Sequence, residues 1–145
     1  MLKIMSAAVL FAAVALPSGA APVTDWKAIA KALDGIPTAA GISLKKRLLN
    51  CKITIHKDTS WMETRAVAWP DYGAKPGDTV IKLLMDLPPA PKQQGPAGLR
   101  PNPPQTNVPA IFVLDTKGKA SAVSSWAGAL LNRPVPLGYD ESNNC

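Results

Sequence analysis

A proline-rich segment between Pro88 and Pro109 is the feature that most limits how this chain can fold. Eight of its 22 residues are proline, and glycine and glutamine make up several of the others. Proline donates no backbone hydrogen bond and has a fixed φ, so this stretch is a poor candidate for a packed helix or a central strand. We expect an extended or mobile loop at 88–109, serving either as a docking arm or as a simple disordered connection.

The first twenty residues have the pattern of a secretory signal peptide. Lys3 supplies the positive end, residues 4–16 form an apolar run, and Ser18 and Ala20 are small residues at the −3 and −1 positions of a cleavage site. The run is too short to cross a bilayer. We therefore expect a mature chain that starts at Ala21, lies in the periplasm or outside the cell, and has no transmembrane segment.

The charge of the chain is mildly positive. Its formal net charge is +6, of which Lys3 contributes one within the predicted signal peptide. Such an excess is typical of a soluble surface, and export excludes nucleic acid as the partner. The densest run, Lys45-Lys46-Arg47, lies between leucines and indicates the solvated face of a helix.

The chain contains two cysteines, Cys51 and the last residue, Cys145. In an oxidising compartment an even pair usually forms a structural disulfide, which would tie the C-terminal tail to the domain. The alternative is a mobile redox pair, which requires an exposed thiolate of low pKa.

Local patterns predict a helical N-terminal segment at 21–50 and a mixed α and β domain at 51–145. We expect a helix at 26–33 capped by Thr24 or Asp25 and a second helix at 43–50. Strands are predicted at 51–56, 80–85, 110–114 and 120–123, with a turn at 116–119 and a final helix beginning after Ser124 or Ser125 and ending at Asn132. Residues 61–69 fit either a helix or a strand.

Two segments resemble thioredoxin-like proteins. Residues 108–119, VPAIFVLDTKGK, are similar to the segment that carries the cis-proline of that family. Residues 53–61 are similar to its first core strand, which leads into the active-site tryptophan. The resemblance implies an α/β fold with a central sheet flanked by helices, a cis Val108–Pro109 bond, a helix starting at Trp61 and a parallel strand at 80–85. The alternative is an α+β fold in which 51–57 and 61–69 form an antiparallel hairpin.

The chain departs from that family where the two catalytic cysteines should follow the tryptophan. The positions read Met62-Glu63-Thr64-Arg65, so the site has no thiolate and no resolving thiol. The resemblance then implies a binding site without redox chemistry, with Trp61, Met62, Val108 and Pro109 as an apolar ledge for an extended peptide. Arg65 would engage a carboxylate of that peptide.

Other chemistry has little support in the sequence. His56 is the only histidine, so a soft-metal site would have to combine it with Met62 and Met85. The sequence has no second histidine that could act as the base of a catalytic triad. We expect no metal and no cofactor, and lean against an enzyme. The favoured hypothesis is an exported, redox-inactive thioredoxin-like domain that binds a protein or peptide of the cell envelope, for example as an assembly or accessory factor. The alternatives are a thiol–disulfide oxidoreductase using Cys51 and Cys145, or a small disulfide-stapled interaction module.

Overall fold

The computed structural model describes residues 21–88 and 105–132. The predicted signal peptide, most of the proline-rich segment and Cys145 lie outside the described residues. The elements in chain order are α1 (Trp26–Asp34), α2 (Leu44–Asn50), β1 (Thr54–Ile55), β2 (Trp61–Thr64), the 3-10 helix η2 (Pro70–Tyr72), β3 (Thr79–Leu87), β4 (Gln105–Leu114), β5 (Ala120–Ala122) and α3 (Ser125–Asn132).

The helices begin where capping residues predict. The Asp25 carboxylate accepts a hydrogen bond from the Lys27 N–H at the start of α1, and the Ser43 hydroxyl accepts one from the Lys46 N–H at the start of α2. The Ser124 hydroxyl accepts a weaker bond from the Ala127 N–H, at 3.4 Å, before α3. These side chains satisfy N–H groups that have no partner within the helix. The expected helices at 26–33 and 43–50 and the final helix are confirmed.

The sheet has five strands and is antiparallel throughout, in the order β1-β3-β4-β5 with β2 also paired to β3. The mixed α and β composition is therefore confirmed, whereas the thioredoxin-like fold is not. The strand expected at 80–85 is central, as predicted, but it runs antiparallel to all of its partner strands rather than parallel. Its length and position allow it to pair with three other strands.

Residues 61–69 do not form a helix. Residues 61–64 are strand β2, and their partner is Thr79–Lys82 of β3. β1 pairs with Met85 and Asp86 further along the same edge of β3. The expected hairpin between 51–57 and 61–69 is therefore wrong as well, because both segments pair with β3 and not with each other. The predicted strand at 51–56 is reduced to Thr54–Ile55.

The loop expected at 88–109 ends earlier than the sequence suggests. Strand β4 already begins at Gln105 and includes Pro109, which lies opposite Leu84 of β3. The Val108–Pro109 peptide bond is trans, so the cis bond implied by the resemblance is wrong. The pairing of β3 with β4 shifts register between Met85 and Leu87. Asn107 of β4 lies at this shift and has a positive φ of 53°, which asparagine adopts more readily than most residues.

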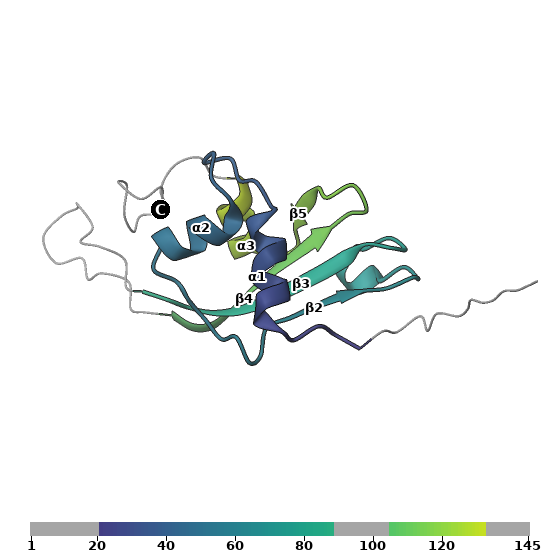
Figure 1. The fold of residues 1–145 in the computed structure, drawn as a ribbon, viewed down its shortest axis with the longest axis horizontal. Helices are drawn as coiled ribbons and strands as arrows, with labels where there is room; N and C mark the ends of the chain where they lie inside the picture. The colour runs from purple at the N-terminus through teal and green to yellow at the C-terminus, as the bar shows by residue number, and fades with distance from the viewer. Residues whose placement is uncertain (1–20, 89–104, 133–145) are drawn as a thin grey trace, which may run out of the picture.

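The molecule has two layers, because the three helices gather on one face of the sheet (Figure 1). Alternate residues of β3 point into that layer and are almost completely buried: Ile81, Leu83, Met85 and Leu87. Phe112 of β4 and Leu33 of α1 complete the same core. Among the described residues, no α-helix covers the opposite face of the sheet, which we call the open face, and only the short 3-10 helix η2 lies over part of it.

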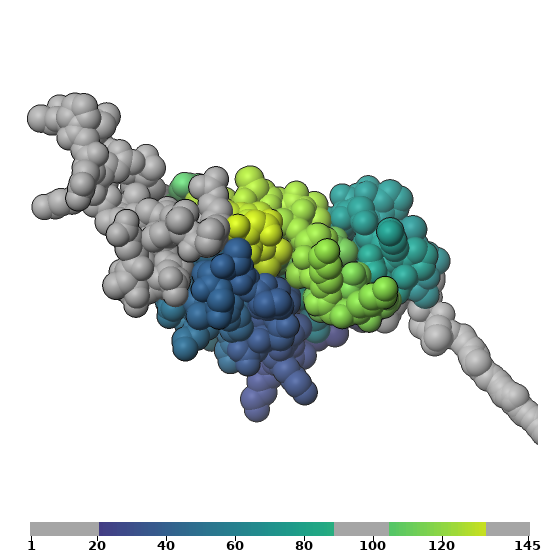
Figure 2. Space-filling model, turned by 90° about the horizontal axis from the view of Figure 1, so that it is seen from above, coloured from purple at the N-terminus to yellow at the C-terminus, as the bar shows by residue number. Residues whose placement is uncertain are grey.

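A second, smaller core lies on the open face at one end of the molecule. Ala74, Val80 and Val113 are buried there beneath the segment that connects β2 to β3. That segment and the β4–β5 turn lie at the same end of the molecule in both views (Figures 1 and 2). Across residues 21–88 and 105–132, no helix has the length and apolar character needed to cross a membrane.

Candidate functional site on the open face

The residues predicted to form one apolar binding surface lie on two different faces of the sheet, because side chains alternate along a strand. Met62 and Val108 point to the helix side and pack against the main core, where both are partly buried. Trp61 packs instead against the smaller core on the open face. Pro109 follows Val108 in the strand, so it also faces the open side and is exposed. The structure therefore brings neither Met62 nor Val108 to the same surface as Trp61 and Pro109.

Three aromatic side chains cluster on the open face, and we call Trp61, Trp69 and Tyr72 the aromatic cluster. The rings of Trp61 and Trp69 stack with 5.8 Å between centroids. Tyr72 meets Trp69 edge-on at 4.8 Å and Trp61 at 6.2 Å. Such geometries add attraction beyond the apolar area that they bury. All three side chains are only partly buried, so the cluster is part of the surface.

Arg65 joins this cluster through its guanidinium. The group lies 3.3 Å from the ring centroid of Trp69, and its Nε donates to the Glu63 carboxylate at 2.5 Å. The Glu63 side chain is only 8 % exposed, whereas that of Arg65 is 35 % exposed. Arg65 thus neutralises a buried carboxylate of its own chain while its planar face covers a tryptophan. The predicted role, binding a carboxylate of a partner, competes with this internal pairing.

The segment between β2 and β3 is held against the sheet by its own backbone bonds. Trp69 and Ala74 form an isolated bridge around η2, which ends at Gly73 in the left-handed region, with φ +66°. The Gly77 N–H donates to the Arg65 carbonyl at 2.7 Å, and this bond joins the two ends of the segment. Glycine is suited to the left-handed conformation because it has no Cβ. The segment is therefore a closed, ordered loop that fixes Trp69 and Tyr72 in place.

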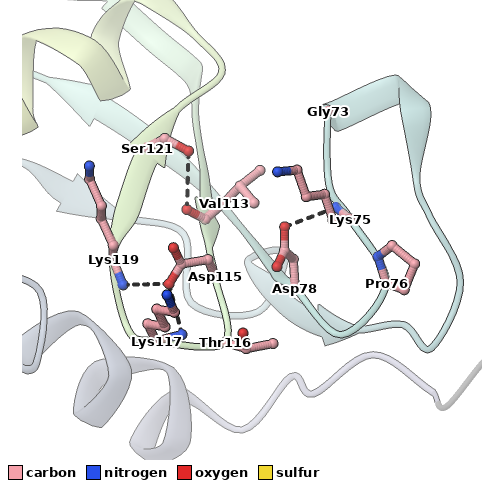
Figure 3. Close-up of a pocket in the computed structure, with 10 residues that line it drawn as sticks. All are labelled: Gly73, Lys75, Pro76, Asp78, Val113, Asp115, Thr116, Lys117, Lys119 and Ser121. Carbon is pink, nitrogen blue, oxygen red and sulfur yellow. Dashed lines mark hydrogen bonds between the residues drawn. The ribbon is translucent and has the colours of Figure 1, made fainter.

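A pocket of about 520 Å³ lies beside the aromatic cluster, between this loop and the β4–β5 hairpin. Val113 and Ser121 line it from the sheet, and three lysines surround it: Lys75, Lys117 and Lys119. Lys75 extends from the loop into the space toward β4 (Figure 3). The volume is within the usual range for small-ligand pockets, roughly 300–1,000 Å³.

The two carboxylates of the pocket are occupied by turn contacts. Asp78 accepts the Lys75 N–H at 2.9 Å, and Asp115 accepts the N–H groups of Lys119 and Lys117 at 2.8 and 2.9 Å (Figure 3). The bond from Lys119 and then that from Lys117 lower the pKa of the Asp115 carboxyl. Both acids therefore serve to shape the loops, and the three lysines leave the lining with one more positive than negative side chain.

The other residues singled out in the sequence, His56 and Cys51, do not line this pocket. His56 lies at the other end of β3, where its Nε2 is 2.7 Å from the Asp86 carboxylate. Among the described residues, no three His, Cys, Asp or Glu side chains lie close enough to hold a metal ion. Cys51 ends α2 and is 1 % exposed. Cys145 is outside the described residues, so the disulfide stays a prediction.

Trp69, Tyr72 and the three lysines were not among the site residues predicted from the sequence. A signal for the first two was present, because two of the four tryptophans and one of the two tyrosines fall within residues 61–72. The lysines come from two loops that are distant in sequence, and no local pattern joins them. No family model, curated protein or solved structure matches this chain.

Proposed function

We propose that the mature protein is an exported, non-catalytic binding module that holds a protein or peptide partner of the cell envelope on its open face. The single observation that carries this proposal is the aromatic cluster with its stacked arginine beside a lysine-lined pocket, on the face that the helices leave uncovered. The localisation follows from the predicted signal peptide.

The residue types of the cluster support a protein partner. Tryptophan, tyrosine and arginine are the side chains most enriched among the residues that dominate binding energy at interfaces. Here all three types lie in contact and stay partly exposed. Because their loop is already ordered, a partner would not need to fix them on binding, which reduces the entropic cost.

The charges of the pocket support a partner with acidic groups. Three lysines and two carboxylates line it, so the lining has one more positive than negative side chain, and the carboxylates of Asp78 and Asp115 are directed at backbone N–H groups of their own turns. Opposite charges on a partner would speed the encounter and fix its orientation.

The two finer hypotheses have less support. The peptide-binding mode of thioredoxin-like proteins needs a cis-proline beside a helix start, whereas Val108–Pro109 is trans and Trp61 begins a strand. A redox role for Cys51 needs an accessible thiolate, whereas this residue is buried. The proposal therefore rests on the open face alone.

Site-specific photo-cross-linking in the native envelope tests this proposal. A benzoylphenylalanine in place of Lys75 reaches the pocket, and the same group in place of Lys31 is exposed on α1, on the helix side. We expect one discrete protein adduct from position 75 and none from position 31. The Lys119→Glu change should reduce the adduct at least several-fold, whereas Lys27→Glu on α1 should leave it unchanged.

Equal adducts from both positions, or none from position 75, would contradict the proposal. A separate assay tests the absence of catalysis: the purified protein should reduce no insulin disulfides above a buffer blank. Turnover that Cys51→Ser abolishes would support the oxidoreductase instead.

A further inference from the structure

A second cavity lies on the helix side of the sheet, far from the aromatic cluster. It has a volume of about 410 Å³ and is formed by α1, α2 and the segment around β1, and we call it the helix-side groove. Leu33, Leu48 and Ile53 form its floor, and all three are at least nine-tenths buried. An apolar floor of this kind favours an apolar ligand group because water there has few hydrogen-bond partners.

The walls of the groove are large apolar side chains that the fold leaves partly uncovered. Leu49 is 68 % exposed, which makes it the most exposed large apolar side chain among the described residues. Trp26 at the start of α1 is partly buried and lines the groove as well. Leu49 makes no contribution to the core that would explain a leucine there.

The charged residues that line the groove are both positive. Lys45 precedes Leu49 by one helical turn, so the two side chains lie on the same side of α2. Lys57 follows β1, and its Nζ lies 5.6 Å from the ring centroid of Trp26. Within the part of the chain that the structure describes, no aspartate or glutamate lines the groove. An apolar floor with two ammonium groups is complementary to a ligand with an apolar tail and an anionic head.

We propose that the helix-side groove binds a single-chain amphiphile with a carboxylate head, of the fatty-acid class. The tail lies over Leu33, Leu48 and Ile53, with Leu49 and Trp26 on either side, and the carboxylate pairs with the ammonium groups of Lys45 and Lys57. This site is independent of the open face, so either proposal can fail without the other.

Isothermal titration of the purified protein with monomeric dodecanoate tests the groove. We expect saturable binding of one dodecanoate per chain, and at least tenfold weaker binding of butyrate and of dodecyltrimethylammonium. The first comparison removes the tail and the second reverses the head. Added salt should weaken the binding of dodecanoate because part of the attraction is between charges.

Variants at exposed positions identify the site without disturbing the core. Lys45→Glu combined with Lys57→Glu, and separately Leu49→Asn, should each weaken dodecanoate binding at least tenfold, with circular dichroism and Tm close to those of the wild type. Lys117→Glu, on the other side of the sheet, is the matched control and should change nothing.

The proposal would be overturned by no saturable binding of dodecanoate, by an unchanged affinity in the folded charge-reversed variant, or by an equal loss of affinity in Lys117→Glu. Sedimentation with phosphatidylglycerol vesicles without binding of monomeric dodecanoate would also overturn it, since the groove would then be a membrane contact.

Discussion

Ser60 is a single residue on which the edge of the sheet depends. It is completely buried between β1 and β2, where β3 would otherwise lack a partner. Its hydroxyl donates to the His56 carbonyl at 2.8 Å and accepts the Leu84 N–H at 3.2 Å. The side chain thus replaces a strand partner for β3 across the interruption. A buried N–H without a partner is costly, which explains a polar residue in this position.

We expect Ser60→Ala to lower the free energy of unfolding by about 1–3 kcal/mol, because it leaves the Leu84 N–H unsatisfied in the interior. Urea denaturation followed by tryptophan fluorescence measures the change. Ser121→Ala is the matched control, since that hydroxyl is exposed and makes only a 3.4 Å bond to the Val113 carbonyl, and it should cost less than about 0.5 kcal/mol. Equal losses of unfolding free energy in the two variants would mean that the hydrogen bonds of the Ser60 hydroxyl do not stabilise the fold.

Asp86 links three elements of the sheet. Its Oδ1 lies 2.7 Å from the His56 Nε2, just after β1, and accepts the Asn107 N–H of β4 at 3.0 Å. The bond to His56 is the main reason why the pKa of the Asp86 carboxyl lies below its ordinary value, and the bond from Asn107 adds to it. One carboxylate therefore joins both neighbours of β3 at the register shift.

A carboxyl with a lowered pKa stabilises the fold above its unfolded pKa, and loses that effect as the pH falls through its folded pKa. We therefore expect the difference in unfolding free energy between the wild type and Asp86→Asn to be largest near neutral pH and to shrink below about pH 4. Denaturation series from pH 7 to pH 2 measure it. In a His56→Gln background the same difference should be smaller and depend less on pH. A difference that stays constant over the whole range would refute this linkage.

At the scale of the whole molecule, the two sides of the sheet are covered differently. The helices cover one face and leave a groove at their edge, whereas a single loop covers part of the other face and leaves a pocket. Cys51 lies on the helix side, at the end of α2 and within the main core. A disulfide to Cys145 would therefore anchor the C-terminal tail to the helical layer.

We expect reduction of the native protein to lower its unfolding free energy by about 4–5 kcal/mol, the loop-entropy value for a loop on the order of 100 residues. Denaturation with and without a phosphine reductant measures the loss, and a variant with both cysteines changed to alanine should show no response to the reductant. Alkylation of two thiols in the folded, unreduced protein would contradict the pairing.

Part of the candidate site could be foreseen from residues 61–65. Trp61 and Arg65 were expected to lie in the site, and they meet through Trp69. Met62 was expected beside them, but in a strand it faces the other way. The error came from the helix start at Trp61 that the resemblance implied, because adjacent side chains lie about 100° apart around a helix but on opposite faces of a strand. A stretch of nine residues is too short for its hydrophobic periodicity to distinguish a helix from a strand.

The sequence by itself determined the features that depend on contacts within a few residues. The caps Asp25 and Ser43 set the starts of two helices, and Gly118, with φ +88°, set the turn between β4 and β5. Each of these effects is local, so a short window contains its whole cause.

Only the tertiary structure decided the strand partners, the trans bond at Pro109 and the assembly of the pocket from Lys75, Lys117 and Lys119. Strand pairing depends on which distant segment can bury the same face, and the energy of that choice comes from the whole core. The positions of the lysines follow from the pairing of β3 with β4, which joins loops that are about 40 residues apart in the chain.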